Sequence, residues 1–385
     1  MVTIERGGSP RPIDKFITND ENGLNWVKIG DAPEQGNYIT QTAEKIRPEG
    51  LSKTREVHPG DLILSNSMSF GRPYIMAIDG CIHDGWLAIR DTKKNFDLKF
   101  LCTLLGTDGM LNQYKAMAAG STVNNLNKEL VGGTTVTFPM VEEQIKIGDY
   151  FTTLDHLITL HQRKCEQTKK LKKYMLQKMF PQNGAKVPEI RFYGFTYDWE
   201  QRKVTDLGEI YIGLVTTMTE HYTDKGHLLI RNSDIKDGYF EFGENPIYLD
   251  EEFSERNKLR MHQLGDVITV HTGDIGTSAV IGENEVNSIG FATIVTRPNQ
   301  EILDSNYFAT YLNTDTHKQW AVSMATGDGR SNYNLKDYTK LVVPIPEIEE
   351  QKKIAACIVN LNSLITLHQR QTDFYKKISF YYISS

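Results

Sequence analysis

The chain has 385 residues, of which 39% are apolar and 24% are charged, and its formal net charge is −6 at pH 7. This length allows roughly two or three domains with separate cores, and the composition is typical of a globular rather than a disordered protein. Apolar runs are too short to cross a bilayer, and the start of the chain lacks the apolar core of a signal peptide, so a cytoplasmic protein without membrane contact is expected. Four scattered cysteines without CxxC spacing argue against a disulfide framework and a zinc site.

Residues 1–140 are predicted to form a first globule of short strands and Gly-rich turns. A Pro-Gly-Asp turn at 59–61 leads into an apolar run that predicts a buried strand, and residues 86–90 predict another. The stretch 96–114 predicts a helix with Asp97 near its start.

Residues 141–181 are predicted to be a single long helix, since no glycine follows Gly148 and no proline occurs before Pro181 within it. Apolar or weakly polar side chains recur every three or four residues, which predicts a seam that lies along another helix. The seam comprises Ile147, Phe151, Leu154, Ile158 and Cys165. At ~1.5 Å per residue, a helix over 142–180 would be roughly 58 Å long, so a spacer is expected.

The end of this helix is basic. Residues 163–178 hold seven basic side chains and one acidic, Glu166. Such a run either faces phosphates or a partner, or it is a solvated helix end that complements the helix dipole. The negative net charge does not exclude a nucleic-acid partner, because binding needs only a local basic patch.

The helix occurs a second time. Residues 349–370 align without gaps on 142–163, with identical Glu-Glu-Gln openings and identical LITLHQR blocks. The second seam comprises Ile354, Ile358, Leu361 and Ile365. Two copies of one amphipathic helix can bury each other's apolar face, so an antiparallel pair is expected. His161 and His368 occupy equivalent seam positions, either as a pH-sensitive register device or as imidazoles packed across the interface.

The globules are repeated as well. A breaker-rich link at 181–188 opens a second globule over 182–346, and 347–385 is predicted to be the second long helix. Residues 264–270 correspond to 59–65, and 303–320 predict a helix with Asp304 near its start. The predicted fold class is therefore mixed α/β: two tandem α/β globules, each followed by a long helix, with the helices packed as an antiparallel coiled coil.

These repeats resemble the specificity subunit of type I restriction–modification enzymes, and the resemblance covers essentially the whole chain. It is carried by the Glu-Glu-Gln openings at 142–144 and 349–351, the LITLHQR blocks, and Tyr-Met-Leu-Gln-Lys-Met-Phe-Pro-Gln at 174–182. Tyr-Asp-Trp-Glu at 197–200 and Leu-Gly-Glu at 207–209 add to it. The motifs are individually weak, but their order and duplication are specific.

The resemblance implies that each globule is a target-recognition domain that reads one half of a split DNA sequence. The helices would set the gap and hold methyltransferase subunits, two of them, and restriction or translocase subunits would complete the complex. The sequence departs from the family at two places. The first globule lacks a counterpart of 199–208, and 374–385 lacks the basic, Met-rich character of 169–180. Either the start codon is misassigned or the chain is a shortened variant.

Enzyme motifs are weak in this sequence. Asn-Pro-Ile-Tyr at 245–248 is one residue away from the Asn-Pro-Pro-Tyr of amino-methyltransferases, but no strand–GxG–helix cofactor loop precedes it. No HExxH or GxSxG pattern occurs. No catalytic residue, metal or cofactor is therefore predicted. Two alternatives remain open: an autonomous adenine-specific methyltransferase, and a duplicated scaffold that binds only proteins.

A protein that recognises double-stranded DNA needs side chains that reach the base edges. It also needs small polar groups or glycine amides that contact the phosphates. Polar Gly-rich loops at equivalent places in both globules supply such groups. The candidate DNA-binding residues are Arg6, Ser9, Arg11, Ser65, Asn66, Ser67, Arg72, Ser121 and Thr122 in the first globule, and Arg231, Asn232, His271, Thr272, Thr277, Arg330 and Asn332 in the second.

Overall fold

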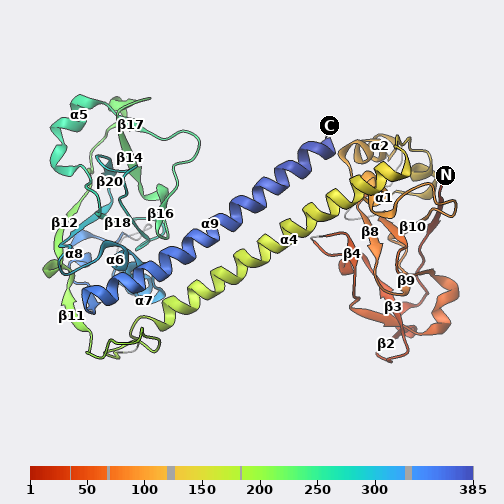
Figure 1. Ribbon diagram of the computed structural model, residues 1–385, viewed down its shortest axis with the longest axis horizontal. Coiled ribbons are helices and arrows are strands. Elements are labelled where there is room, and N and C mark those ends of the chain that lie inside the picture. Colours follow the sequence, from red (N-terminus) through yellow and green to blue (C-terminus); the bar gives the residue numbers. More distant parts are fainter. Residues whose placement is uncertain (35, 67–69, 119–125, 183, 326–331, 385) are drawn as a thin grey trace. The chain divides into compact units, whose positions relative to one another are not determined.

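The computed structural model describes residues 1–34, 36–66, 70–118, 126–182, 184–325 and 332–384. The chain divides into two compact units (Figure 1). Unit 1 comprises Met1–Arg163 and His368–Ser385, and unit 2 comprises Lys164–Leu367. This division passes through both long helices, whereas the domain boundaries predicted from the sequence fall at the helix ends.

Unit 1 is built on two five-stranded sheets, ordered β1-β10-β7-β8-β4 and β2-β5-β3-β9-β6. The strands are β1 (Thr3–Arg6), β2 (Ile17–Thr18), β3 (Leu24–Val27), β4 (Tyr38–Ile39), β5 (Glu44–Ile46), β6 (Arg55–Val57), β7 (Leu62–Ser65), β8 (Pro73–Met76), β9 (Gly80–Ile82) and β10 (Trp86–Arg90). Its shorter helices are α1 (Leu98–Leu105), α2 (Asp108–Ala118) and α3 (Lys128–Gly132), with 3₁₀ turns at Ile13–Lys15, Ile29–Asp31 and Pro48–Lys53. Successive residues of a strand point to opposite faces, so Leu62 and Leu64 join a core with α1 and α2 while Ile63 joins a core on the other face.

Unit 2 has two four-stranded sheets, ordered β12-β21-β18-β19 and β13-β17-β14-β20, and two strand pairs, β11-β22 and β15-β16. The strands are β11 (Glu200–Lys203), β12 (Gly208–Ile212), β13 (Tyr222–Thr223), β14 (His227–Arg231), β15 (Ile235–Lys236), β16 (Tyr239–Phe240), β17 (Tyr248–Leu249), β18 (Val267–Thr269), β19 (Ser278–Val280), β20 (Ile289–Phe291), β21 (Ile294–Pro298) and β22 (Val342–Ile345). The shorter helices are α5 (Glu251–Arg256), α6 (Ser305–Leu312), α7 (Asp315–Met324) and α8 (Leu335–Tyr338), with 3₁₀ turns at Val204–Asp206, Thr219–His221, Asn232–Asp234 and Lys258–Arg260.

The helix predicted over 96–114 and the one predicted over 303–320 are each two helices, so the prediction of one helix was wrong in both units. Thr107 and Thr314 lie at the breaks, and their side-chain oxygens accept the backbone N–H groups of Met110 and His317, respectively. Because an N-cap residue has a non-helical backbone, the preceding helix ends at the threonine and a new helix begins after it. Asp97 and Asp304, predicted near the helix starts, are the N-caps of α1 and α6.

The buried Gln of each Glu-Glu-Gln motif explains why the motif is repeated. Gln144 and Gln351 are both 0% exposed. Gln144 Oε1 accepts the Asp97 N–H at 2.9 Å, and its Nε2 donates to the carbonyls of Asn95 and Pro139. Gln351 makes the same three bonds, to Asp304, Ile302 and Pro346. Each Gln thus ties the start of a long helix to the helix pair of its own globule.

The long helices are α4 (Val141–Lys178) and α9 (Ile348–Ser384), the yellow-green and blue helices of Figure 1, and they confirm the predicted helices. In unit 2, Cys165 Sγ lies 4.0 Å from the Ile365 carbonyl, while Leu176, further along α4, shares a core with Ile354 and Ile358. The helices therefore pack antiparallel. Of the predicted seam, Leu154, Cys165, Ile354, Ile358 and Leu361 are buried, and Ile147, Phe151, Ile158 and Ile365 are half-buried. In unit 1, His161 and His368 meet with their Nδ1 atoms 3.1 Å apart.

Candidate nucleic-acid interface

In unit 1, four strands end at one edge of the sheets, around the connection from β9 to β10. Strands β3 and β9 are parallel neighbours, so both end at this edge. Strands β1 and β7 flank β10 and run opposite to it, so they end where β10 begins. Loops far apart in the sequence are therefore brought together around residues 83–85.

Asp84 is hydrogen-bonded to three of the predicted DNA-binding residues of unit 1. Its carboxylate Oδ1 accepts the Ser9 hydroxyl at 2.9 Å, and its backbone carbonyl accepts Asn66 Nδ2 at 2.9 Å and Arg6 Nε at 3.4 Å. Asn66 is 3% exposed, whereas Arg6 is exposed at the rim. The buried amide fixes the loop, and the guanidinium remains at the surface beside it.

His83 belongs to this cluster and was not singled out from the sequence. Its Nδ1 accepts the Gly85 N–H at 3.0 Å, and its Nε2 lies 2.9 Å from Asp84 Oδ1. The first contact requires an unprotonated Nδ1, so Nε2 carries the hydrogen that faces Asp84. Trp26 packs edge-on against the ring. The imidazole is thus held in one tautomer and one orientation.

The other candidates of unit 1 support the fold, are exposed beside the cluster, or lie outside the described residues. Ser65 is buried and its hydroxyl accepts the Arg72 backbone N–H. Arg72 Nη2 donates to the carbonyls of Glu34 and Gly36, and its guanidinium lies over the Tyr74 ring. Both contacts support the fold. Arg11 is exposed in the loop after β1. Ser67, Ser121 and Thr122 lie outside the described residues.

Unit 2 repeats this edge, with Asn232 at its centre. The Asn232 amide donates to the carbonyls of Phe291 and Ala292, both at 3.3 Å, and its Oδ1 accepts the His271 N–H at 2.7 Å. These contacts join the loops that follow β14, β18 and β20. Thr272 Oγ1 donates to Asn332 Oδ1 at 2.8 Å and also lies 2.7 Å from His271 Nδ1. Partial burial lowers the pKa of His271, which favours a neutral imidazole at this edge.

Two unit 2 candidates are occupied by internal contacts. The Arg231 guanidinium makes a two-pronged contact with Asp234, at 2.9 and 3.0 Å, which neutralises much of its charge. Thr277 is buried and donates to Asp274 at 2.6 Å, so it stabilises its own turn. Arg330 lies outside the described residues.

Backbone contacts show which positions of the two edges correspond. Gly7 N donates to the Trp86 carbonyl as Gly213 N does to that of Thr293. A Cβ on Gly7 would lie 2.1 Å from the His83 carbonyl oxygen, and one on Gly213 would lie 2.3 Å from that of Gly290. Only glycine permits this approach, so the two loops begin at the same point.

Three pairs of equivalent positions follow from this alignment. In the loop after β1 or β12, Ser9 corresponds to Val215 and Arg11 to Thr217. The next residues also match, since Gly8 N donates to the Ile82 carbonyl and Leu214 N to that of Gly290. His83, the residue after Ile82, therefore corresponds to Phe291, the residue after Gly290. The backbone contacts of the edge are therefore repeated in both units, whereas the side chains that face outward differ between the units.

Lys28 and Arg231 form a further equivalent pair. Lys28 N donates to Asp31 Oδ2 at 2.7 Å as Arg231 N donates to Asp234 Oδ2 at 2.9 Å. The sequence signal was available, because Val-Lys-Ile-Gly-Asp at 27–31 resembles Ile-Arg-Asn-Ser-Asp at 230–234. Lys28, Val215 and Thr217 were missed because no recognised loop motif surrounds them.

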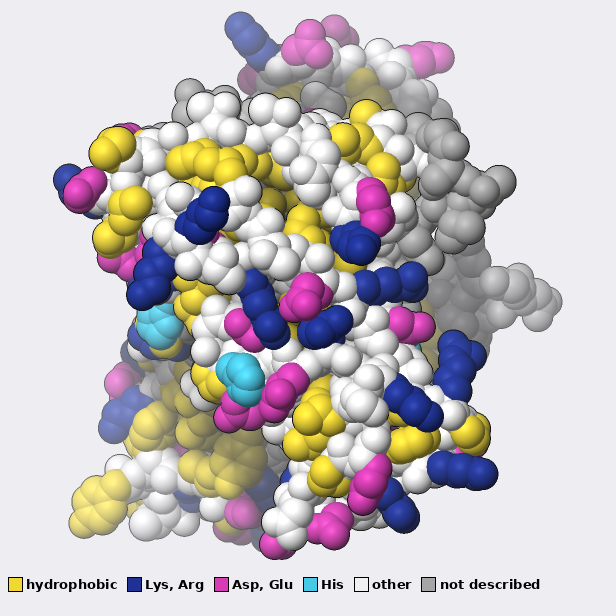
Figure 2. Space-filling model, turned by 90° about the vertical axis from the view of Figure 1, so that its right-hand side faces the viewer, with side chains coloured by type: hydrophobic (Ala, Val, Ile, Leu, Met, Phe, Trp, Pro, Cys, Tyr) yellow, Lys and Arg dark blue, Asp and Glu magenta, His cyan; other side chains and the backbone are white. Residues whose placement is uncertain are grey.

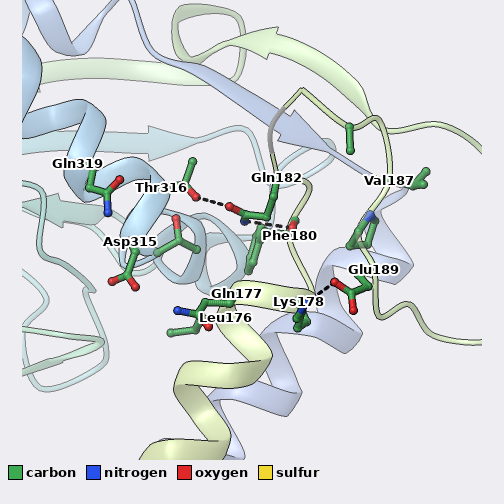
Figure 3. A pocket seen from close by; sticks show the side chains of 13 residues that line it. Leu176, Gln177, Lys178, Phe180, Gln182, Val187, Glu189, Asp315, Thr316 and Gln319 are labelled. Atoms are coloured by element: carbon green, nitrogen blue, oxygen red, sulfur yellow. Dashed lines mark hydrogen bonds and ion pairs between the residues drawn. The ribbon is translucent and has the colours of Figure 1, made fainter.

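Two cavities are lined by residues other than the DNA-binding candidates. In unit 2, a cavity of ≈ 670 Å³ lies between the end of α4, the link that follows it and the first turn of α7 (Figure 3). Thr316 donates to Gln182 at 2.9 Å across one side, and Lys178 pairs with Glu189. In unit 1, a cavity of ≈ 250 Å³ lies beside Asp155, whose pKa is raised by burial. No predicted DNA-binding residue lines either cavity.

One face of the molecule is mixed in charge. On the face seen in Figure 2, Lys and Arg side chains alternate with Asp and Glu and with apolar groups. Recognition on such a surface depends on particular side chains more than on a broad positive field. Among the described residues, no three His, Cys, Asp or Glu side chains are grouped to hold a metal ion, and no helix there is long and apolar enough to cross a membrane.

These observations define a class of protein: two recognition units on a duplicated frame, each with a polar edge of its own. The Type I restriction modification DNA specificity domain family matches residues 3–170 and 197–373. The chain belongs to this family, and the resemblance and the predicted mixed α/β fold class with two long, packed helices are confirmed. Its relatives are specificity subunits, the non-catalytic subunits of type I restriction enzymes.

The named relatives are distant in sequence. The chain is 22% identical over 381 residues to the type I restriction enzyme EcoBI specificity subunit of Escherichia coli, covering 93% of this chain and 77% of that protein. It is 23% identical over 382 residues to the putative MjaX specificity subunit of Methanocaldococcus jannaschii, covering 95% and 84%.

Two solved structures have the same fold. The type I restriction-modification S subunit from M. genitalium matches with a TM-score of 0.60 at 13% identity, over 100% of this chain and 95% of that one. A chain from a study of assembly and conformational transition in a type I R-M system matches with a TM-score of 0.51 at 17% identity, over 99% and 96%.

Proposed function

We propose that this chain recognises a bipartite DNA sequence within a type I restriction–modification complex in the cytoplasm, with one half-site read by each unit. The observation that carries the proposal is the pair of equivalent edges. Each edge is held by backbone contacts that the other repeats, while its outward side chains differ at matching positions. Two readers of different sequences on one scaffold require that combination.

The loops at these edges offer the groups that DNA recognition uses. Exposed Arg6 and Arg11 can meet phosphates or guanine edges, and the hydroxyls of Ser233 and Thr272 can meet bases or phosphates, while the Asn232 amide holds the loops together. Ser67, Ser121, Thr122 and Arg330 stay candidates by their position in the sequence. Ser65 and Thr277 are proposed as supports of the loops.

The long helices are proposed to set the gap between half-sites and to hold two methyltransferase subunits. In unit 2, exposed apolar side chains lie on both helices although the seam itself is covered. They are Leu171 and Tyr174 on α4 and Leu364 and Leu367 on α9, each at least 44% exposed. Uncovered apolar groups on a helix pair favour further helices from a partner. Restriction or translocase subunits would join the same complex.

Binding measurements on the assembled chain and modification subunit test the proposal. The complex should bind duplex DNA that carries its methylated motif more tightly than a duplex with that motif scrambled. Affinity should fall with salt, because phosphate contacts release counterions. Equal, salt-insensitive affinity for both duplexes would instead favour the protein-binding scaffold. S-adenosylmethionine turnover by the purified chain alone would restore the methyltransferase alternative.

A further inference from the structure

The edge of unit 2 around Asn232 carries exposed apolar side chains to which no role has yet been assigned. Val215 is 68% exposed and Phe291 is 41% exposed. They belong to neighbouring segments, because Leu214 and Phe291 form a β-bridge and Ala292 N donates to the Leu214 carbonyl at 2.9 Å. Both side chains thus lie beside the loops that Asn232 joins, which places them within the candidate interface.

The cations near this pair are engaged in local contacts: Arg231 with the Asp234 carboxylate, Lys236 with the Ser233 carbonyl and Arg260 with the Ile212 carbonyl. The exposed residues that adjoin the pair carry hydroxyls, including Thr216, Thr217 and Ser233. At the equivalent positions, unit 1 has Ser9 in place of Val215, Arg11 in place of Thr217 and His83 in place of Phe291. The same two places are therefore polar in one unit and apolar in the other.

Base edges in the major groove explain what an apolar pair can read. Thymine presents a 5-methyl group there, and apolar side chains, phenylalanine among them, recognise it by contact. Guanine and adenine present hydrogen-bonding groups, which suit Arg and Asn, respectively. An exposed Val and Phe beside a polar loop thus favour a half-site with a thymine at the position they face.

We infer that Val215 and Phe291 are specificity-determining residues of unit 2 that contact a thymine methyl group in the half-site this unit reads. The inference rests on the proposed function and makes it more specific. Unit 1, with arginines and a histidine at the same edge, reads a half-site without that methyl contact.

Deoxyuridine provides the test, since it differs from thymidine only by the methyl group. The probe is a duplex carrying the motif mapped for the chain assembled with its modification subunit, with each thymidine of the unit 2 half-site replaced in turn. For the wild-type complex, one replacement should weaken binding about fourfold, which corresponds to the ~0.8 kcal/mol of one buried methyl group. Val215→Ser and Phe291→His, which copy unit 1, should lose that sensitivity. Val322→Thr, an exposed valine on α7, is the matched control and should keep it.

The outcomes separate the inference from the proposed function. If the wild-type complex binds its motif but no deoxyuridine replacement matters, the thymine contact is refuted while DNA recognition stands. Persistence of the sensitivity in both variants refutes it equally. If Val215→Ser leaves DNA affinity unchanged but weakens assembly with the modification subunit, the pair contacts protein and the inference is overturned. A wild-type complex without sequence preference would refute the proposed function as well.

Discussion

Replacing Gln351 by leucine tests how the repeated motif holds a globule on its long helix. The leucine fills the same fully buried site but cannot bond the Asp304 N–H, the Ile302 carbonyl or the Pro346 carbonyl, which Gln351 contacts at 2.9, 3.0 and 2.9 Å. Each lost bond is worth about 1 kcal/mol, and leaving buried partners unpaired adds to this. The free energy of unfolding of unit 2 should therefore fall by roughly 3–5 kcal/mol.

Urea denaturation followed by tryptophan fluorescence measures this loss, since Trp199 and Trp320 report on unit 2. Gln167→Leu, an exposed position on α4 within unit 2, is the control and should change the free energy of unfolding by less than about 0.5 kcal/mol. Gln144→Leu should cost unit 1 a similar amount, because its three bonds match. A Gln351→Leu variant whose unit 2 is no less stable than that of Gln167→Leu would contradict this role of the motif.

Other predictions concern stability and spacing. Arg191→Met should cost about 3–5 kcal/mol in urea denaturation, because it leaves the fully buried Glu350 carboxylate unpaired; a loss below 1 kcal/mol would contradict the buried ion pair. Burial lowers the pKa of His262 to about 3 and that of His317 to about 4, so both stay neutral when folded but take up a proton near pH 6.5 when unfolded. The free energy of unfolding of unit 2 should therefore be highest above pH 6.5 and fall as the pH drops from 6.5 towards 4, by up to ~1.4 kcal/mol per pH unit for each histidine. His317→Gln should make this decrease shallower. A wild-type free energy that does not change over this pH range would refute the prediction. Inserting four residues, about one helical turn, after Gln162 should lengthen the gap in the methylated motif and leave both halves unchanged, whereas altered bases in both halves would refute the spacer role.

The sequence predicted most of the architecture because each long helix is marked by motifs that occur in both halves of the chain. The Glu-Glu-Gln openings and the LITLHQR blocks identified both long helices, and Asp97 and Asp304 were correctly placed at helix starts. The breaks at Thr107 and Thr314 were missed, since whether a threonine side chain caps a helix depends on local geometry.

The candidate site was less predictable, because it is assembled from loops that only the sheet topology brings together. Asn66 and Asn232 were chosen as DNA readers, yet their amides hold the β9–β10 and β20–β21 connections. His83, in the His-Asp-Gly turn at 83–85, and Val215, an apolar residue, were both overlooked. Their equivalence to Phe291 and Ser9 emerges only from matching backbone hydrogen bonds.

Exchange of one globule tests the central claim most directly. Residues 182–346 would be replaced by the corresponding segment of another specificity subunit, and methylated adenines would be mapped in DNA treated with the chimaera and its modification subunit. The account predicts that one half of the motif changes while the other half and the gap are retained. Altered bases in both halves, or in neither, would contradict a division of recognition between the two units.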